Sequence, residues 1–303
     1  MTFIKIKKYL MIIFLISSAI GNMGCSSGAD DTPVPEEPKA KSVVIATYNI
    51  GYDNATAPAN QLWGNRRPLA VNLITKHKFD IFGAQEPLYN QLQDLTTSLP
   101  AYKYLGLSRD GSSNSGEFAP IFYNSETIEI LESGQFWLTD QVDKSKPSVG
   151  WDARYPRTCV WAKASHKESK AVFYVFNIHL DHVGFQARTE SVKLLLSEIP
   201  RIANGTPYFL LGDFNFDQNS ANYQTLQSDP NFVDTYGITK RGINSQRGTF
   251  NGYNPNSTSN VRIDHIFTDK KKSPNILRHQ IITDSSSGST ASDHFPVLVE
   301  VTF

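Results

Sequence analysis

Polar side chains that could act as ligands, acids or bases stand at the ends of several apolar segments of this sequence. A buried strand would normally not end in such side chains, because burying an unpaired carboxylate or amide costs free energy. The positions are Asn49 in TYNIG, Glu86 in GAQEP, Asn177 and His179 in NIHLDH, Asp213 and Asn215 in LGDFN, Asp264 in RIDHIF, and Asp293 with His294 in SDHFP. Six segments that end alike predict one hydrated, charged site, since ligands of open α/β sheets bind beyond strand ends.

The residue types at this predicted site favour a metal-assisted reaction with proton transfer. Carboxylate and amide oxygens suit Mg²⁺ or Mn²⁺, and these ions keep several waters, so few protein ligands are needed. A histidine such as His294, held by a carboxylate such as Asp264, would have its tautomer fixed and its charged form favoured. We therefore expect Mg²⁺ or Mn²⁺ as the cofactor.

Hydrophobic periodicity predicts the elements that must hold these side chains. Apolar residues at helical spacing predict helices over 66–77 and 188–199. Apolar and β-branched runs predict strands at 42–50, 80–86, 117–124, 128–138, 158–166, 171–180, 207–215, 262–269, 276–284 and 295–303. Helices alternate with single strands in places and strands follow strands elsewhere, which indicates two sheets covered by helices. Because side chains alternate along a strand, Asn177 and His179 should share one face.

Each polar residue also has an explanation that needs no chemistry. Asn49 and Asp213 are common turn residues, and Asp264 could pair with Arg262 at the surface. Glu86 precedes a proline and could be a solvated loop acid or a helix cap. Local structural roles are expected for three neighbours of the motifs, namely Asp181, His182 and His265. The constellation, rather than any single residue, supports the predicted site.

The N-terminal residues have the pattern of a processed leader. Three early lysines precede an apolar segment over 10–20, too short for a comfortable membrane span, and Gly24-Cys25 is typical of bacterial lipoprotein processing. We predict a lipoprotein signal peptide over 1–24, lipidation of Cys25, and a flexible tether over 25–41. A plain secretory signal is the alternative. The predicted location is the cell envelope, where the lipid anchors the protein at the outer membrane and is its membrane contact. The sequence leaves the periplasmic and the external face open.

One domain is predicted over 42–303, and its composition restricts the classes of function. The predicted leader contains three of the 29 Lys and Arg residues, so its removal leaves 26 basic residues and 29 acidic residues. A slightly acidic chain lacks the broad basic surface expected of a nucleic-acid binder. Apart from Cys25 the only cysteine is Cys159, which excludes an intramolecular disulfide and a cysteine-based zinc site. A phosphate-binding G-x-x-x-x-G-K-[ST] loop and a G-x-S-x-G nucleophile motif are absent from the sequence.

The motifs, in the order TYNI, QE, NIHLDH, GDFN, RIDHIF and SDHFPV, resemble those of the endonuclease/exonuclease/phosphatase superfamily of DNase-I-like metal-dependent phosphoesterases. The resemblance covers residues 42–303. It implies an α/β fold, namely a four-layer α/β/β/α sandwich of two mixed sheets flanked by helices. It also implies hydrolysis of a phosphoester by in-line attack of an activated water, without a covalent intermediate.

The resemblance further implies roles for the residues at the motif positions. Glu86 would bind the metal ion, with Asn49 and Asp293 near it. His294, paired with Asp264, would contact the scissile phosphate or act as a general acid or base. The remaining roles are polarisation of the attacking water by Asp213, phosphate contact by His179, and hydrogen bonds to phosphate oxygens from Asn177 and Asn215.

The sequence restricts the substrate less closely. Gly51 follows the first Asn at a place where nuclease members often carry an acid or amide, and NIHLDH is closer to the corresponding motif of deadenylases, sphingomyelinases and inositol-phosphate phosphatases. Arg can bind phosphate oxygens and aromatic faces can stack on sugars or bases. The residues that could line a pocket in this way are Trp63, Arg66, Trp137, Trp151, Arg154 and Arg157, and from these we assign Arg66, Arg154 and Trp137 to the substrate.

Three functions are compatible with these observations. The favoured one is a monomeric hydrolase of a small phosphorylated substrate, a glycan, inositol or lipid-headgroup phosphate, as monoester or diester. A surface nuclease is the second, and nucleic acid is then the partner. An inactive binding lipoprotein is the third, and it is disfavoured because the chain retains Glu86, Asp213, Asp264 and His294.

Overall fold

A computed structural model describes residues 41–286 and 288–303. The predicted signal peptide, the lipidation site Cys25 and almost all of the predicted tether lie outside the described residues. Within the described part of the chain, no helix has the length and apolar character needed to cross a membrane.

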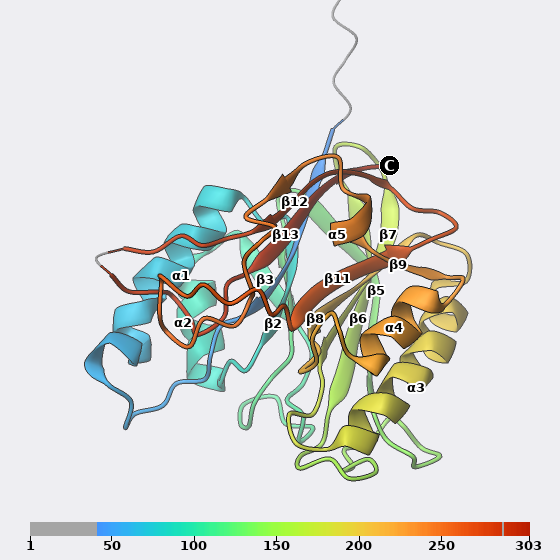
Figure 1. Cartoon of the computed structure of the whole chain (residues 1–303), viewed down its shortest axis with the longest axis horizontal. Helices are drawn as coiled ribbons and strands as arrows, with labels where there is room; N and C mark the ends of the chain where they lie inside the picture. Colours follow the sequence, from blue (N-terminus) through green and yellow to red (C-terminus); the bar gives the residue numbers. More distant parts are fainter. Residues whose placement is uncertain (1–40, 287) are drawn as a thin grey trace, which may run out of the picture. The chain divides into compact units, whose positions relative to one another are not determined.

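Two sheets carry the architecture (Figure 1). The first has seven strands in the order β10-β12-β13-β1-β2-β4-β3, which are Gly242–Ile243, Asn275–Ile281, Val297–Thr302, Val43–Asn49, Ile81–Gln85, Ile121–Asn124 and Tyr102–Leu105. The second has six strands in the order β5-β6-β7-β8-β11-β9, which are Ile128–Trp137, Thr158–His166, Val172–His179, Tyr208–Asp213, Asp264–Asp269 and Phe232–Asp234. Both sheets are mixed, because β1 pairs parallel with β2 and β7 pairs parallel with β8, while their other neighbours are largely antiparallel.

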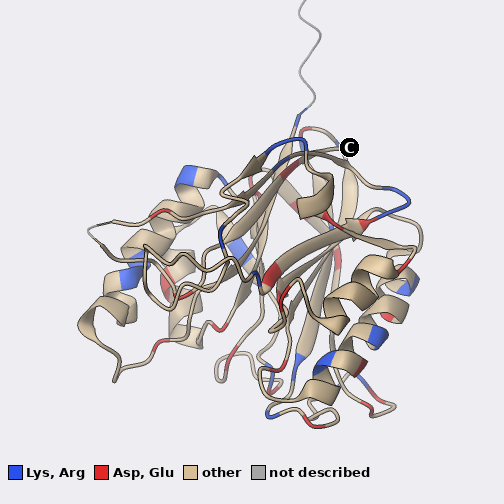
Figure 2. Ribbon diagram, viewed as in Figure 1, with Lys and Arg blue, Asp and Glu red and all other residues tan. Residues whose placement is uncertain are grey.

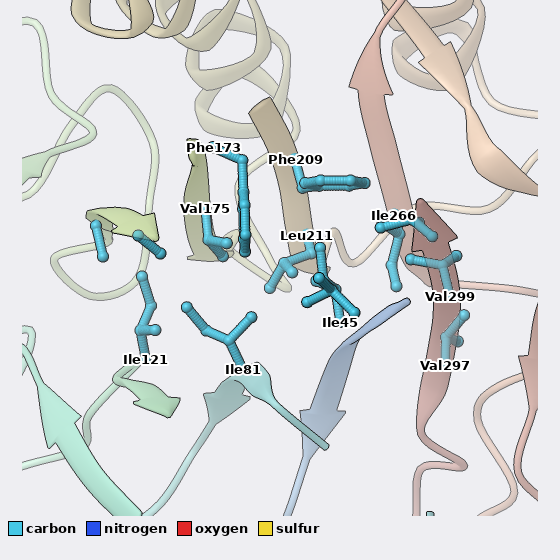
Figure 3. Packing of buried hydrophobic residues seen from close by; sticks show 14 of the residues in the cluster. Ile45, Ile81, Ile121, Phe173, Val175, Phe209, Leu211, Ile266, Val297 and Val299 are labelled. Atoms are coloured by element: carbon cyan, nitrogen blue, oxygen red, sulfur yellow. The ribbon is translucent and has the colours of Figure 1, made fainter. Parts of the chain in front are cut away.

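The two sheets pack face to face over an apolar core. Alternation along each strand sends every second side chain inward, so that Ile45 and Ile81 of one sheet meet Phe173, Phe209 and their neighbours of the other (Figure 3). These side chains are almost completely buried. At one end of the strands the inward-facing row changes from apolar side chains to acids and histidines, and that end is where the site lies.

Helices cover the outer face of each sheet. α1 (Trp63–His77) and α2 (Tyr89–Ser98) pack on the first sheet, and α3 (Phe185–Ala203) and α4 (Ala221–Ser228) pack on the second. Short helical turns complete the described elements, namely η1 (Ala59–Gln61) and α5 (Thr235–Ile238). The helices therefore lie on both sides of the paired sheets, and the predicted four-layer α/β/β/α fold is confirmed.

Local sequence explains which elements were predicted. The helix predicted over 66–77 begins slightly earlier, at Trp63, and the helix predicted over 188–199 extends to Phe185–Ala203. The helices α2 and α4 were not predicted, because their segments YNQLQDLTTS and ANYQTLQS offer few apolar residues at helical spacing. Tertiary packing of a few buried side chains per helix stabilises them instead.

Candidate active site

Strand register aligns three predicted catalytic residues in a row. On the parallel pair β7–β8, His179 lies opposite Asp213, and on the antiparallel pair β8–β11, Asp213 lies opposite Asp264. All three stand on the inward-facing side of their strands, in line with buried core residues such as Leu211. The row is thus the polar continuation of the core between the sheets.

The other sheet contributes an amide and a carboxylate to the same place. Asn49, the last residue of β1, donates from Nδ2 to Glu86 Oε1 at 3.0 Å and to Asp213 Oδ2 at 3.1 Å. Its Oδ1 accepts from the Gly51 amide at 3.0 Å. Asn49 therefore holds two acidic side chains from different sheets against each other, which is a positioning role in addition to any contact with an ion.

Backbone conformation directs Glu86 into the site. Its φ of 70° lies in the left-handed region, which few non-glycine residues adopt, and its Oε2 accepts from the Tyr52 amide at 3.2 Å. Asn215, two residues beyond Asp213, has a φ of 50° in a similar position after β8. Such conformations concentrate at functional sites, where the surrounding structure holds them in place.

His294 and Asp264 form the predicted buried pair. His294 Nδ1 lies 2.8 Å from Asp264 Oδ2, and His294 Nε2 lies 3.8 Å from Asp213 Oδ2. Burial lowers the pKa of His294, but the charge and hydrogen bond of Asp264, together with the charges of Asp213 and Asp293, outweigh burial, so the pKa stands well above its usual value. The imidazole is therefore held in its charged, proton-donating form beside the Asp213 carboxylate.

A second histidine–carboxylate contact joins His179 to Glu117, a residue to which the sequence analysis gave no role. His179 Nδ1 lies 3.6 Å from Glu117 Oε1, and His179 Nε2 lies 3.6 Å from Asp213 Oδ2. Burial raises the pKa of Glu117, but His179 and the guanidinium groups of Arg109 and Arg157 outweigh it, and the pKa is lowered. Glu117 lies in the sequence far from every recognised motif, so no spacing signal identified it.

These groups surround one pocket of about 780 Å³. Its lining residues are Tyr52, Glu86, Leu88, Arg109, Asp110, Gly116, Glu117, Tyr155, Arg157, His179, His182, Asp213, Asn215, Phe250, Ile263, Asp293 and His294. On one side of its rim the Arg109 guanidinium lies 4.2 Å from the ring centroid of Tyr155. The pocket therefore combines acids and histidines with basic and aromatic walls, which suits a small anionic ligand that carries a polar organic group.

The acidic groups fit a hard divalent cation. Ligand atoms of Glu86, His179 and Asp213 lie within 4.8 Å of one another, and Asp293 lines the same pocket. Burial raises the pKa of Glu86, with partial compensation from His179 and from the Asn49 hydrogen bond. A buried carboxylate of this kind gains most from a cation beside it. The carboxylate oxygens of this set suit Mg²⁺ or Mn²⁺ rather than a thiol-seeking metal.

The structure places Arg66 away from the pocket, which corrects its predicted contact with the substrate. Its guanidinium is fully buried and donates to five backbone carbonyl oxygens, namely those of Ile50, Gly51, Tyr52, Gln61 and Ala291. No donor remains for a phosphate. Arg66 instead fixes the loop after Asn49 against the loop before Asp293, so it supports the site from behind.

Asn177 is also a structural residue, contrary to its predicted role as a phosphate contact. Its Nδ2 lies 2.9 to 3.0 Å from the carbonyl oxygens of Ala84, Ala119 and Pro120, and its Oδ1 accepts from Gln85 at 2.7 Å. All of these partners belong to the first sheet or its connections. A Cβ at Gly83 would collide with the Asn177 amide, so this glycine makes room for the link between the sheets.

Trp137 and Arg154, also assigned to the substrate, do not line the pocket. The Trp137 ring is buried, and its Nε1 donates to the Arg109 carbonyl at 2.7 Å, so it supports the pocket wall. Arg154 is exposed and lies 5.7 Å from the ring centroid of Tyr155, on the solvent side of the rim. Spacing along the chain does not distinguish residues that line the pocket from residues that pack behind its lining.

The structure shows the local role expected of Asp181 and the packing role expected of His265, whereas His182 lies at the pocket rim instead. Asp181 accepts from the Val183 and Gly184 amides at 2.9 and 2.7 Å and also from Arg157 Nε at 3.2 Å. His182 lines the pocket and contacts Arg157 Nη2 at 3.0 Å through Nδ1, so it has a place at the rim. His265 packs among aromatic rings in the core and has no access to the pocket.

Comparison with known proteins agrees with this arrangement. The model of the Endonuclease/Exonuclease/phosphatase family matches residues 46–294. The chain belongs to this family. Family members generally depend on a divalent metal, and the acidic cluster described above is compatible with that dependence.

Solved structures from Bacteroides thetaiotaomicron are similar to this family member over almost their whole length. A family protein of that organism is 37% identical with a TM-score of 0.82, covering 88% of this chain and 99% of the other. A mannosyl-6-phosphatase of the same organism is 38% identical with a TM-score of 0.82, covering 86% of this chain and all of the other. At the level of fold alone, TDP2 from D. rerio, complexed with single-strand DNA product, shares 18% identity and a TM-score of 0.64 over 86% of this chain and 99% of the other.

A curated relative carries no functional information. An uncharacterised protein of Acanthamoeba polyphaga mimivirus is 26% identical over 258 residues, which are 78% of this chain and 91% of the relative. The family and its phosphoesterase fold are thus shown, and the substrate has to be argued from the pocket.

Proposed function

We propose that the protein is a Mg²⁺- or Mn²⁺-dependent phosphatase that removes the phosphate from a phosphorylated sugar. The observation that carries this proposal is the pocket itself, in which Asp213 lies between two carboxylate-held histidines with Glu86 beside it. A relative of 38% identity that is a mannosyl-6-phosphatase supports a sugar phosphate over an inositol or lipid phosphate.

Each charged side chain of the pocket has its own role in the hydrolysis. A divalent ion held by Glu86, with Asp213 and Asp293 near it, would supply positive charge to the phosphate oxygens. Asp213 accepts the proton of the attacking water. The charged His294 donates a proton to the sugar oxygen as its bond to phosphorus breaks, which leaves the sugar alcohol and inorganic phosphate. His179, oriented by Glu117, donates to a non-bridging phosphate oxygen.

The rim of the pocket suits the sugar. Beyond the acidic end, Tyr155 is partly exposed between Arg109 and His182, and its ring centroid lies 6.4 Å from that of His182. This side offers N–H donors and an aromatic edge to hydroxyl groups. The volume of about 780 Å³ accommodates a hexose phosphate with space for a further unit.

Charge distribution supports a small substrate over nucleic acid. In Figure 2 the Lys and Arg positions are interspersed with Asp and Glu positions through the described domain. A nuclease would be expected to present a continuous basic groove along the nucleic-acid backbone.

As part of the same proposal, the protein acts as a lipoprotein in the cell envelope, where glycan phosphates are accessible.

The test compares three substrates with the purified protein in Mg²⁺ or Mn²⁺. We expect release of inorganic phosphate from mannose 6-phosphate, slower cleavage of a bis-aryl phosphodiester, and no nicking of plasmid DNA. EDTA should stop the reaction, and His294→Ala should lose it while retaining the fold by circular dichroism. Nicking of DNA without phosphate release from the sugar would instead establish a nuclease.

A further inference from the structure

A second depression of about 790 Å³ lies on the outer face of the six-stranded sheet. It is bordered by β5 and β6, by the last turns of α3 and by the loop that follows β5. It shares no lining residue with the catalytic pocket. Along β7, Tyr174 at this depression is five residues from His179 at the active site, or roughly 16 Å at the rise of an extended strand.

An indole ring forms the floor of this depression. Trp161 of β6 lies opposite Gly134 of β5, and a Cβ at Gly134 would lie 2.5 Å from the Trp161 ring. The glycine therefore lets the indole lie across the neighbouring strand instead of standing away from the sheet. Tyr174 borders it with a ring centroid 6.0 Å away, and Phe136 completes an aromatic surface.

Four of the five charged side chains around this floor form two ion pairs, and the fifth, Lys144, donates from Nζ to the Gln141 carbonyl at 3.3 Å. Lys163 Nζ lies 3.1 Å from Glu132 Oε1, and Arg201 Nε lies 3.0 Å from Glu198 Oε2. Glu132 and Arg201 remain 55% and 68% exposed, so their outer polar atoms are free to bind hydroxyl groups. Both lining acids are paired with bases, and Lys144 is the one lining base without an acid partner, so the depression carries little net charge and offers few free cationic groups to a phosphate or a nucleic-acid backbone.

An aromatic floor with paired charges around it matches the two chemical faces of a sugar ring. The C–H face of a hexose is apolar and packs on an indole, while its hydroxyl groups both donate to carboxylates and accept from ammonium and guanidinium groups. We propose that this depression binds a neutral oligosaccharide and thereby retains a glycan whose phosphorylated end reacts elsewhere on the same molecule. The biological purpose of this second site rests on the proposed function, but its ligand class rests on Trp161 and its surroundings.

The test measures binding of unphosphorylated mannohexaose by isothermal titration calorimetry. We expect saturable binding to the purified protein and a loss of about tenfold or more in affinity for Trp161→Ala, since the stacking surface is removed. Gly134→Val is the second variant, because its side chain displaces the indole without removing it, and it should weaken binding similarly. Turnover of mannose 6-phosphate serves as the check of folding, and we expect it to be unchanged in both variants.

The control variant is Asp264→Asn, which disables the catalytic pocket and should leave mannohexaose affinity unchanged. Affinity that falls with Asp264→Asn, or that inorganic phosphate abolishes, would place the sugar in the catalytic pocket and overturn the inference. Absence of binding to mannohexaose, cellohexaose and maltohexaose by the wild-type protein would also overturn it. Trp161-dependent binding in a protein that hydrolyses no sugar phosphate would uphold the second site and refute only the proposed function.

Discussion

Replacement of Asn177 by alanine separates a structural role from a catalytic one. The sequence motif predicts that Asn177 binds phosphate, whereas the structure uses its amide to join the two sheets. Because this amide joins the sheets, Asn177→Ala should destabilise the fold strongly and leave the Michaelis constant of the surviving folded enzyme nearly unchanged.

The expected loss of stability follows from the lost hydrogen bonds. The two N–H groups of the Asn177 amide serve carbonyl oxygens at 2.9 to 3.0 Å, and its oxygen accepts from Gln85 at 2.7 Å. Three hydrogen bonds at about 1 kcal/mol each, plus the cost of leaving buried partners unpaired, give about 3 to 5 kcal/mol. Gln85 keeps its bond to Thr47 at 3.1 Å, which limits the loss on that side.

The assay combines urea unfolding with steady-state kinetics, and Asn215→Ala is the matched control. The Asn215 amide makes one bond, to the Leu180 carbonyl at 2.9 Å, and lines the pocket. We expect a stability loss of about 1 kcal/mol for this control together with a raised Michaelis constant. The reasoning fails if Asn177→Ala unfolds at the wild-type urea concentration but binds substrate about tenfold more weakly.

Three further predictions concern charge. Glu86→Gln should reduce metal-dependent turnover about a thousandfold without lowering the melting temperature, as judged by phosphate release and by thermal unfolding in EDTA. Asp264→Asn removes the charge that raises the pKa of His294, so kcat should fall by roughly 10²- to 10⁴-fold and the limb of the pH profile that reports His294 should move to lower pH. Burial lowers the pKa of both His265 and His279 from 6.5 to about 4, so the unfolded chain binds more protons between these values and stability must fall as pH drops from 6.5 to 4. Each pKa shift corresponds to about 3 kcal/mol of unfolding free energy. His279→Gln should therefore flatten the pH dependence of the urea midpoint between pH 6.5 and 4. A wild-type midpoint that stays constant over this range would contradict the buried neutral state of the histidines.

The motifs of the sequence were sufficient to indicate the family, and the resemblance to that family implied the layer architecture that the structure confirms. Apolar runs that end in acids and histidines indicated strands whose ends meet, and the structure brings Glu86, His179, Asp213, Asp264 and His294 together. Side-chain alternation within a strand can be read from local sequence, and the order of the motifs indicated the family, whereas the pairing and register of the strands join residues far apart in the chain. Even so, the metal contacts and the proton-transfer roles of these residues stay predictions until they are measured.

The tertiary structure decided which polar residues face the pocket and which hold it in place. Asn177 shares a motif with the pocket residue His179, and Arg66 has a residue type that suits a phosphate, yet their polar atoms bind backbone carbonyl groups. Glu117 carries no motif, yet folding places it beside His179. The reason is that a side chain's partners across two sheets depend on long-range packing, which residue type and local spacing do not encode.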